Sequence, residues 1–163
     1  MVSNFKESLA VGQEFESRII ELTGGTAVDL YHQSLGIDIQ IEDLQIDLEC
    51  KHDKRAATTN NFYAELTTGQ KPGCLFTSLA DFIILKIGED DSQYWVFKPR
   101  DFLIAYTTVF SRLNLKTVSC INPNGYSSTG MLIPVKKLTQ FAKLIQAENL
   151  LGYLKAVSTP TYF

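Results

Sequence analysis

The sequence has no long hydrophobic run and no recognisable export signal. No stretch approaches about 18 uninterrupted apolar residues, the length expected of a membrane-spanning helix. The N-terminal sequence MVSNFKESLAVGQEFES is too charged and too weakly apolar for a secretory signal. These two absences predict a cytoplasmic protein without a membrane partner.

Cysteine is scarce, with three residues that are far apart in the sequence: Cys50, Cys74 and Cys120. They form no CxxC pair and no Cys/His cluster, so the sequence offers no zinc site. Disulfides are rare in cytosolic proteins, and an unpaired cysteine usually behaves as a small apolar residue. We therefore expect all three to be buried structural residues.

A strong excess of charge of one sign is also missing, because 15 Lys and Arg oppose 18 Asp and Glu for a net charge of −3. Nucleic-acid binding usually requires a basic surface, so this balance is mildly unfavourable for such a partner. It does not exclude a metal-dependent nuclease, whose acidic cluster is neutralised by its ions. Local patches also matter more than the total charge.

The chain has 163 residues, of which 45% are hydrophobic and 20% charged. This composition is ordinary for a folded protein, and a domain of this length can bury roughly 70% of the surface of its unfolded chain. The sequence contains no internal repeat and no linker long enough to divide it. The prediction is one domain over residues 1–157 and a C-terminal tail over 158–163.

Hydrophobic periodicity predicts a mixture of helices and strands. Apolar residues recur at helical spacing from residue 4 to about 22, where Gly24-Gly25 ends the helix. Alternation of apolar and polar residues indicates strands instead, and the pattern of residues 60–66 is ambiguous. The predicted strands are 27–31, 37–41, 46–51, 81–87, 94–98 and 131–135, the later helices 101–110 and 137–149, the turns 71–73 and 88–92, and the loop 122–130.

The segment 36–51, GIDIQIEDLQIDLECK, has the pattern of a β-hairpin. A two-residue turn at Asp43-Leu44 would set Ile41 against Ile46 and Asp38 against Glu49. One face would then be entirely apolar, with Ile37, Ile39, Ile41, Ile46, Leu48 and Cys50. The other face would present Asp38, Glu49 and Lys51.

This polar face could carry metal chemistry. Directly opposed residues have Cβ atoms about 4.5–5.5 Å apart, so two carboxylates would repel each other unless a cation lay between them. Oxygen ligands of this kind suit Mg²⁺, and Lys51 could orient or help deprotonate a water molecule. The alternative is a solvated strand face on which Glu49 and Lys51 form a surface ion pair.

Two segments of the sequence resemble the active-site motifs of the PD-(D/E)xK nuclease superfamily: Gly36-Ile37-Asp38-Ile39 and, after it, Leu48-Glu49-Cys50-Lys51. The site of this superfamily has an acid on one strand and acid-x-lysine on the next. Segments 60–66, 71–75 and 80–82 resemble a branch that is common among phage-encoded nucleases. The resemblance covers roughly residues 12 to 110, or 135 at its longest. The second motif lacks the proline that some members carry.

The resemblance implies an α/β fold with a restriction-endonuclease-like mixed central sheet flanked by helices. It also implies Mg²⁺-dependent (or Mn²⁺-dependent) hydrolysis of DNA phosphodiester bonds. Asp38, Glu49 and the backbone carbonyl of Cys50 would hold the ion, and Lys51 would position the attacking water.

Members of the superfamily commonly add a glutamate from the first helix. Glu14 and Glu16 both qualify, and we favour Glu16 because it lies three and four positions before Ile19 and Ile20, at the margin of the buried face. Glu65 could also approach the metal, and Asp47 is a reserve ligand. Either could equally be a surface residue.

Several polar residues are candidates for contact with the DNA backbone. His52, Lys54 and Arg55 belong to the densest basic cluster of the sequence, KHDKR, whose first residue is Lys51. Gln70 and Lys71 could bind phosphate, although a simple polar turn would explain them as well.

The substrate and even the catalytic role stay open at this point. A small stand-alone domain suits a junction resolvase, which would act as a homodimer, but also a non-specific or repair endonuclease acting on DNA or RNA. The chain could instead be a non-catalytic nucleic-acid- or protein-binding module that retains the nuclease fold, or a plain α/β structural domain.

Overall fold

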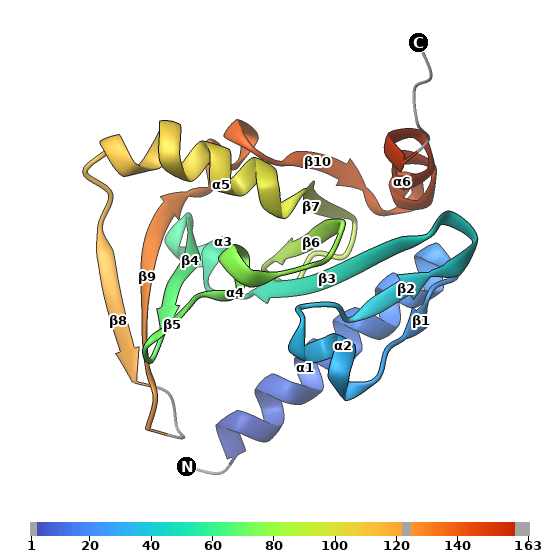
Figure 1. The fold of residues 1–163 in the computed structure, drawn as a ribbon, viewed down its shortest axis with the longest axis horizontal. Coiled ribbons are helices and arrows are strands. Elements are labelled where there is room, and N and C mark those ends of the chain that lie inside the picture. The colour runs from blue at the N-terminus through green and yellow to red at the C-terminus, as the bar shows by residue number, and fades with distance from the viewer. Residues whose placement is uncertain (1–2, 122–124, 159–163) are drawn as a thin grey trace.

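The computed structural model describes residues 3–121 and 125–158 (Figure 1). The helices are α1 Ser3–Thr23, α2 Leu30–Ser34, α3 Ala56–Thr59, α4 Cys74–Thr77, α5 Pro99–Thr108 and α6 Leu150–Ser158. The strands are β1 Thr26–Ala27, β2 Ile39–Ile41, β3 Ile46–Asp53, β4 Asn61–Thr68, β5 Lys71–Pro72, β6 Phe82–Ile87, β7 Gln93–Phe97, β8 Thr117–Ile121, β9 Ser127–Pro134 and β10 Lys143–Gln146. Short 3₁₀ helices cover Glu42–Leu44, Phe110–Arg112, Val135–Gln140 and Ala147–Asn149.

The strands form two sheets. The larger has the order β1-β2-β3-β6-β7-β10, and the smaller has the order β5-β4-β9-β8. Within the larger sheet β3 and β6 run parallel, whereas the other neighbouring strands are antiparallel. The predicted α/β class with a mixed sheet and flanking helices is therefore confirmed, and the second sheet is an addition that the sequence analysis did not include.

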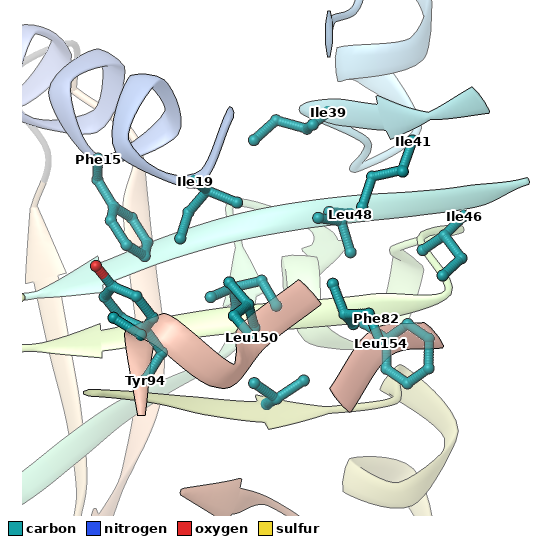
Figure 2. Packing of buried hydrophobic residues seen from close by; sticks show 13 residues of the cluster. Phe15, Ile19, Ile39, Ile41, Ile46, Leu48, Phe82, Tyr94, Leu150 and Leu154 are labelled. Carbon is teal, nitrogen blue, oxygen red and sulfur yellow. The ribbon is translucent and has the colours of Figure 1, made fainter. Parts of the chain in front are cut away.

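The larger sheet packs against a hydrophobic core on each of its faces. Its central strand β6 is therefore buried on both sides. On one face, Phe82 and Ile84 pack with Phe15 of α1 and Leu150 of α6 (Figure 2). On the other face, alternate β6 residues pack against β4, β9 and α5, in a cluster that includes Ile83, Leu85, Phe62, Ile133 and Phe102. Strand alternation thus assigns successive residues to different cores.

The hairpin of β2 and β3 has the predicted register. Ile39 pairs with Leu48, Gln40 with Asp47 and Ile41 with Ile46. The predicted two-residue turn is wrong, because the connection is a 3₁₀ turn over Glu42–Leu44 followed by Gln45 in the left-handed region at φ 52°. The register survives since the paired apolar residues on either side of the turn are all buried.

The first predicted strand is correct only at its start. Strand β1 ends at Ala27, and helix α2 begins at Leu30. Asp29 caps this helix, because its carboxylate accepts the backbone N–H of His32 at 2.9 Å. A capping aspartate three residues before its partner is a helix-start signal, and it outweighs the β-propensity of the apolar residues around it.

The predicted closing helix over residues 137–149 is wrong. That stretch is a 3₁₀ segment followed by strand β10, in which Leu144 pairs with Trp95 and Ile145 with Tyr94 of β7. The terminal helix is α6 instead, which runs to Ser158 and so includes the first residue of the predicted tail. Residues 159–163 lie outside the described part of the chain.

The smaller sheet replaces several predicted loops and turns. The ambiguous segment is strand β4, and the predicted turn over 71–73 is displaced to Gly69-Gln70, since Thr68 pairs with Lys71. Gly69 has φ +60°, as the first residue of a type II′ hairpin turn requires. The predicted loop over 122–130 already belongs to β9 from Ser127, and its residues 122–124 lie outside the described part.

Two of the compositional predictions can be compared with the structure. Cys50 and Cys74 are half-buried and Cys120 is exposed, so the expectation of burial is wrong for Cys120; all three are free thiols. In the described ranges, no helix is long and apolar enough to cross a membrane.

Candidate functional site

Asp38 immediately precedes β2, and its partner strand β3 continues beyond this end of β2. The Asp38 N–H donates to the Leu48 carbonyl at 2.8 Å, and its Oδ2 accepts the N–H of Cys50, also at 2.8 Å. In a longer β2 strand, the Cys50 N–H would bond to a backbone carbonyl of that strand. Here the Asp38 carboxylate accepts this N–H instead. This contact fixes an acidic side chain against β3 beside Glu49 and Lys51.

Glu49 is the buried acid of the site. Its side chain is only 3% exposed, and its Oε1 lies 2.6 Å from the Lys51 ammonium nitrogen. Oε2 is buried and has no hydrogen-bond partner. The Ser78 hydroxyl donates to the Gly36 carbonyl at 3.1 Å and also lies close enough to Glu49 to lower its pKa. A buried, unpaired carboxylate oxygen is costly, so Oε2 marks a position suited to a cation or a water molecule.

The pKa values in this pair move in the directions expected of a buried ion pair. Burial raises the pKa of Glu49, and the Lys51 ammonium counteracts only part of that rise. For Lys51, burial is the largest single influence and favours the neutral amine, but Glu49, Cys74 and Asp38 together outweigh it and raise the Lys51 pKa above its ordinary value. Lys51 is therefore a cation at every physiological pH.

Glu16, rather than Glu14, belongs to this cluster. Burial raises the pKa of Glu16, the Asp38 carboxylate raises it further, and the Lys51 ammonium lowers it. Charges influence each other in this way only when they are close. Glu14 is exposed and lines a separate cleft on α1. The structure thus brings together Glu16, Asp38, Glu49 and Lys51, from α1, the start of β2, and β3.

Cys74 and Ser78 are neighbours of the site that the sequence analysis did not assign. Burial raises the pKa of the Cys74 thiol, and the adjacent Lys51 ammonium lowers it. Glu65 of β4 is also close enough to raise the pKa of this thiol. Gly73 is the residue in the sequence that could have indicated the closeness of α4 to β4. A Cβ at this position would overlap the Glu65 carbonyl, so the glycine allows α4 to approach β4.

His52 lies on the other face of β3 from Lys51, and Lys54, which directly follows β3, lines the same cleft as His52. The His52 ring packs 5.9 Å from the Phe15 ring of α1, and its Nε2 is 2.6 Å from the Gly88 carbonyl oxygen. Lys54 forms an ion pair of 2.8 Å with Glu89. Because successive strand residues point to opposite faces, this basic cluster is divided by the sheet.

The other substrate-binding candidates are exposed. Arg55 immediately precedes α3, while Gln70 and Lys71 lie at the β4–β5 hairpin turn. Asp47 pairs with Gln40, and its backbone N–H binds the carboxylate of Asp81 at 2.8 Å, which connects β3 to the start of β6. None of these placements tests a role in binding.

A cleft of about 450 Å³ lies between α1 and the ends of β3 and β6, on the His52 side. Its cations are already paired: Arg18 with Glu21, Lys54 with Glu89 and Lys86 with Asp91. Since Lys51 and Glu49 do not line it, this cleft is distinct from the acidic cluster. The cluster is the candidate functional site because, among the described residues, it is where a buried carboxylate oxygen has no partner.

Among the described residues, no three His, Cys, Asp or Glu side chains converge as a ready-made metal cluster. Comparison of the chain with protein-family models, with curated proteins and with solved structures found no significant match. The resemblance to PD-(D/E)xK nucleases therefore stays a prediction from the motifs.

Proposed function

We propose that this protein is a Mg²⁺-dependent DNA endonuclease of the PD-(D/E)xK type, with a restriction-endonuclease-like fold. The observation that carries the proposal is the Glu49 carboxylate, which is buried with one unpaired oxygen while Asp38 and Glu16 lie close by. A buried carboxylate oxygen without a partner is costly, and a cation at this position would relieve that cost as well as the repulsion from the Asp38 and Glu16 charges. The motif spacing in the sequence supports the same conclusion.

The available ligands fit magnesium. Asp38 and Glu49 supply carboxylate oxygens, the Cys50 carbonyl could add a third oxygen, and Glu16 is placed to hold a coordinated water. Mg²⁺ prefers oxygen ligands and usually retains several waters. When bound, such an ion would polarise the phosphate and lower the pKa of a bound water.

Lys51 would act on the same water and phosphate. In the structure its ammonium neutralises Glu49 at 2.6 Å, which is the role that a divalent cation between the carboxylates would take over. The ammonium would then be available to orient the attacking water or to stabilise charge on the phosphate oxygens. We assign it to positioning of the water and to electrostatic stabilisation of the phosphate.

The test is a nuclease screen with Mg²⁺ or Mn²⁺ on linear, single-stranded, flapped and four-way-junction DNA. Under single-turnover conditions with saturating protein, Lys51→Ala should reduce the cleavage rate by a factor on the order of 10² or more. The matched control is Lys54→Ala, because Lys54 lines the separate cleft on the His52 side and should affect binding and its salt dependence at most. Equal rates for Lys51→Ala and wild type would refute the mechanism.

The second candidate is a non-catalytic nucleic-acid- or protein-binding module. The observation in its favour is that Lys51 already neutralises Glu49, so the fold does not need an ion to balance that charge. Calorimetric titration with Mn²⁺ distinguishes the two functions. Binding by wild type that is lost in Asp38→Asn supports the nuclease, whereas no binding by either protein supports the module.

A further inference from the structure

Strand β8 forms an open edge of the smaller sheet. It pairs with β9 on one side, from Thr117 opposite Met131 to Ile121 opposite Ser127. It is the last strand in its sheet, and in the described part of the chain nothing pairs with its other side. Figure 1 shows β8 at the outer margin of the molecule, away from α1 and the β2–β3 hairpin.

The hydrogen bonds to β9 determine which backbone groups of β8 point outward. The Leu132 N–H donates to the Lys116 carbonyl at 2.9 Å, which makes residues 116 and 132 a hydrogen-bonded pair. Such pairs alternate along an antiparallel ladder, so Val118 and Cys120 also face β9. The N–H and C=O groups of Thr117, Ser119 and Ile121 therefore face the open edge.

This edge lacks the features that usually prevent strand pairing. The sequence TVSCI contains no charge and no proline, and its register with β9 has no bulge. Ile121 is 82% exposed and Cys120 is also exposed. Natural edge strands are commonly protected by lysine, proline, bulges or a covering element, so a bare uncharged edge indicates a pairing partner.

We propose that β8 pairs antiparallel with β8 of a second copy of this chain, about a twofold axis at Ser119. In that register Ser119 faces Ser119 of the second copy, and Thr117 faces Ile121. All of the outward N–H and C=O groups of the strand then find partners, and no charge meets its own copy. The two smaller sheets would join into one continuous sheet. A five-residue strand pair is a small interface, so the dimer should be weak and should form at micromolar or higher protein concentration.

Sedimentation velocity over about 1–200 μM tests the association. Wild type should shift from monomer to dimer, and Ser119→Pro should stay monomeric because it removes an outward N–H while sparing the bonds to β9. Ser119→Ala is the matched control: it also loses the Ser119–Thr129 side-chain hydrogen bond but keeps the N–H, so it should dimerise as wild type does. A wild type that stays monomeric throughout, or a Ser119→Pro dimer of undiminished affinity, would overturn the proposal.

Disulfide cross-linking tests the register without relying on a proline variant. The twofold places Val118 opposite Cys120 of the second copy as a non-hydrogen-bonded pair, with Cα atoms about 4.5 Å apart, within disulfide range. Oxidised Val118→Cys should therefore give a reducible covalent dimer. Wild type and the double variant Val118→Cys/Cys120→Ser should not, because their remaining cysteines are offset by two positions. A Val118→Cys protein that yields no covalent dimer would exclude this register.

Discussion

Replacing Lys51 by alanine should destabilise the metal-free protein, because it leaves the Glu49 carboxylate buried without its counter-ion. Glu49 is 3% exposed and its Oε2 already lacks a partner, so removal of the 2.6 Å ion pair leaves the whole group unpaired. Breaking a fully buried pair costs about 3–5 kcal/mol. The Lys51 side chain is 34% exposed, so water can enter its place, and a loss of about 2 kcal/mol is the appropriate scale.

The dependence on pH follows from the direction of the Glu49 shift. Its pKa is raised by burial, and without Lys51 it rises further. A raised carboxyl pKa favours the folded state below the unfolded-state value of about 4.5, and this contribution is lost as pH rises through the folded pKa. The deficit of Lys51→Ala should therefore be largest near neutral pH and shrink under acid conditions.

Thermal unfolding measures the effect, with Glu49→Gln as the second corner of a double-mutant cycle. At pH 7, Lys51→Ala should lower the melting temperature by about 4–8 °C, and the same substitution in the Glu49→Gln background should have little effect. Saturating Mn²⁺ should restore part of the loss in the single variant. Additive effects of the two substitutions would show that the ion pair contributes nothing, and the reasoning about Glu49 would be wrong.

Three further predictions concern the site and its support. Asp38→Asn keeps an oxygen for the Cys50 N–H, so its free energy of unfolding in urea should stay within about 1 kcal/mol of wild type while Mn²⁺ affinity by calorimetry falls at least tenfold. Mn²⁺ affinity should also decline on acidification at a pH above the ordinary carboxyl range, because the pKa values of Glu16 and Glu49 are raised; a titration flat down to pH 5 would contradict this. Gly73→Ala should destabilise by about 2 kcal/mol or more in urea unfolding, since its Cβ would overlap the Glu65 carbonyl, whereas Gly12→Ala, with open space around it, should be neutral or stabilising by up to about 1 kcal/mol.

Where sequence patterns were long and local, they predicted the structure well. The first helix, strands β3, β6 and β7, helix α5 and the hairpin register all follow from periodicity that burial enforces. The closing helix failed because the spacing of Leu138, Phe141, Leu144 and Ile145 suits a helix as well as a strand. The segment became a strand because β10 pairs with the edge of β7 that β6 does not occupy. This pairing is a long-range contact, which no local sequence pattern contains.

The sequence by itself determined which side chains share a face of the hairpin, because alternation and buried isoleucines leave one register, and so it selected Asp38, Glu49 and Lys51. Only the tertiary structure decided what surrounds them. Packing of α1 brings Glu16 rather than Glu14 to the cluster, and the approach of α4 to β4 adds Cys74 beside Lys51. The sheet separates His52 from Lys51, although they are adjacent in sequence, because strand neighbours point to opposite faces. Burial of Glu49, which gives the site its unpaired oxygen, exists only once both layers have packed.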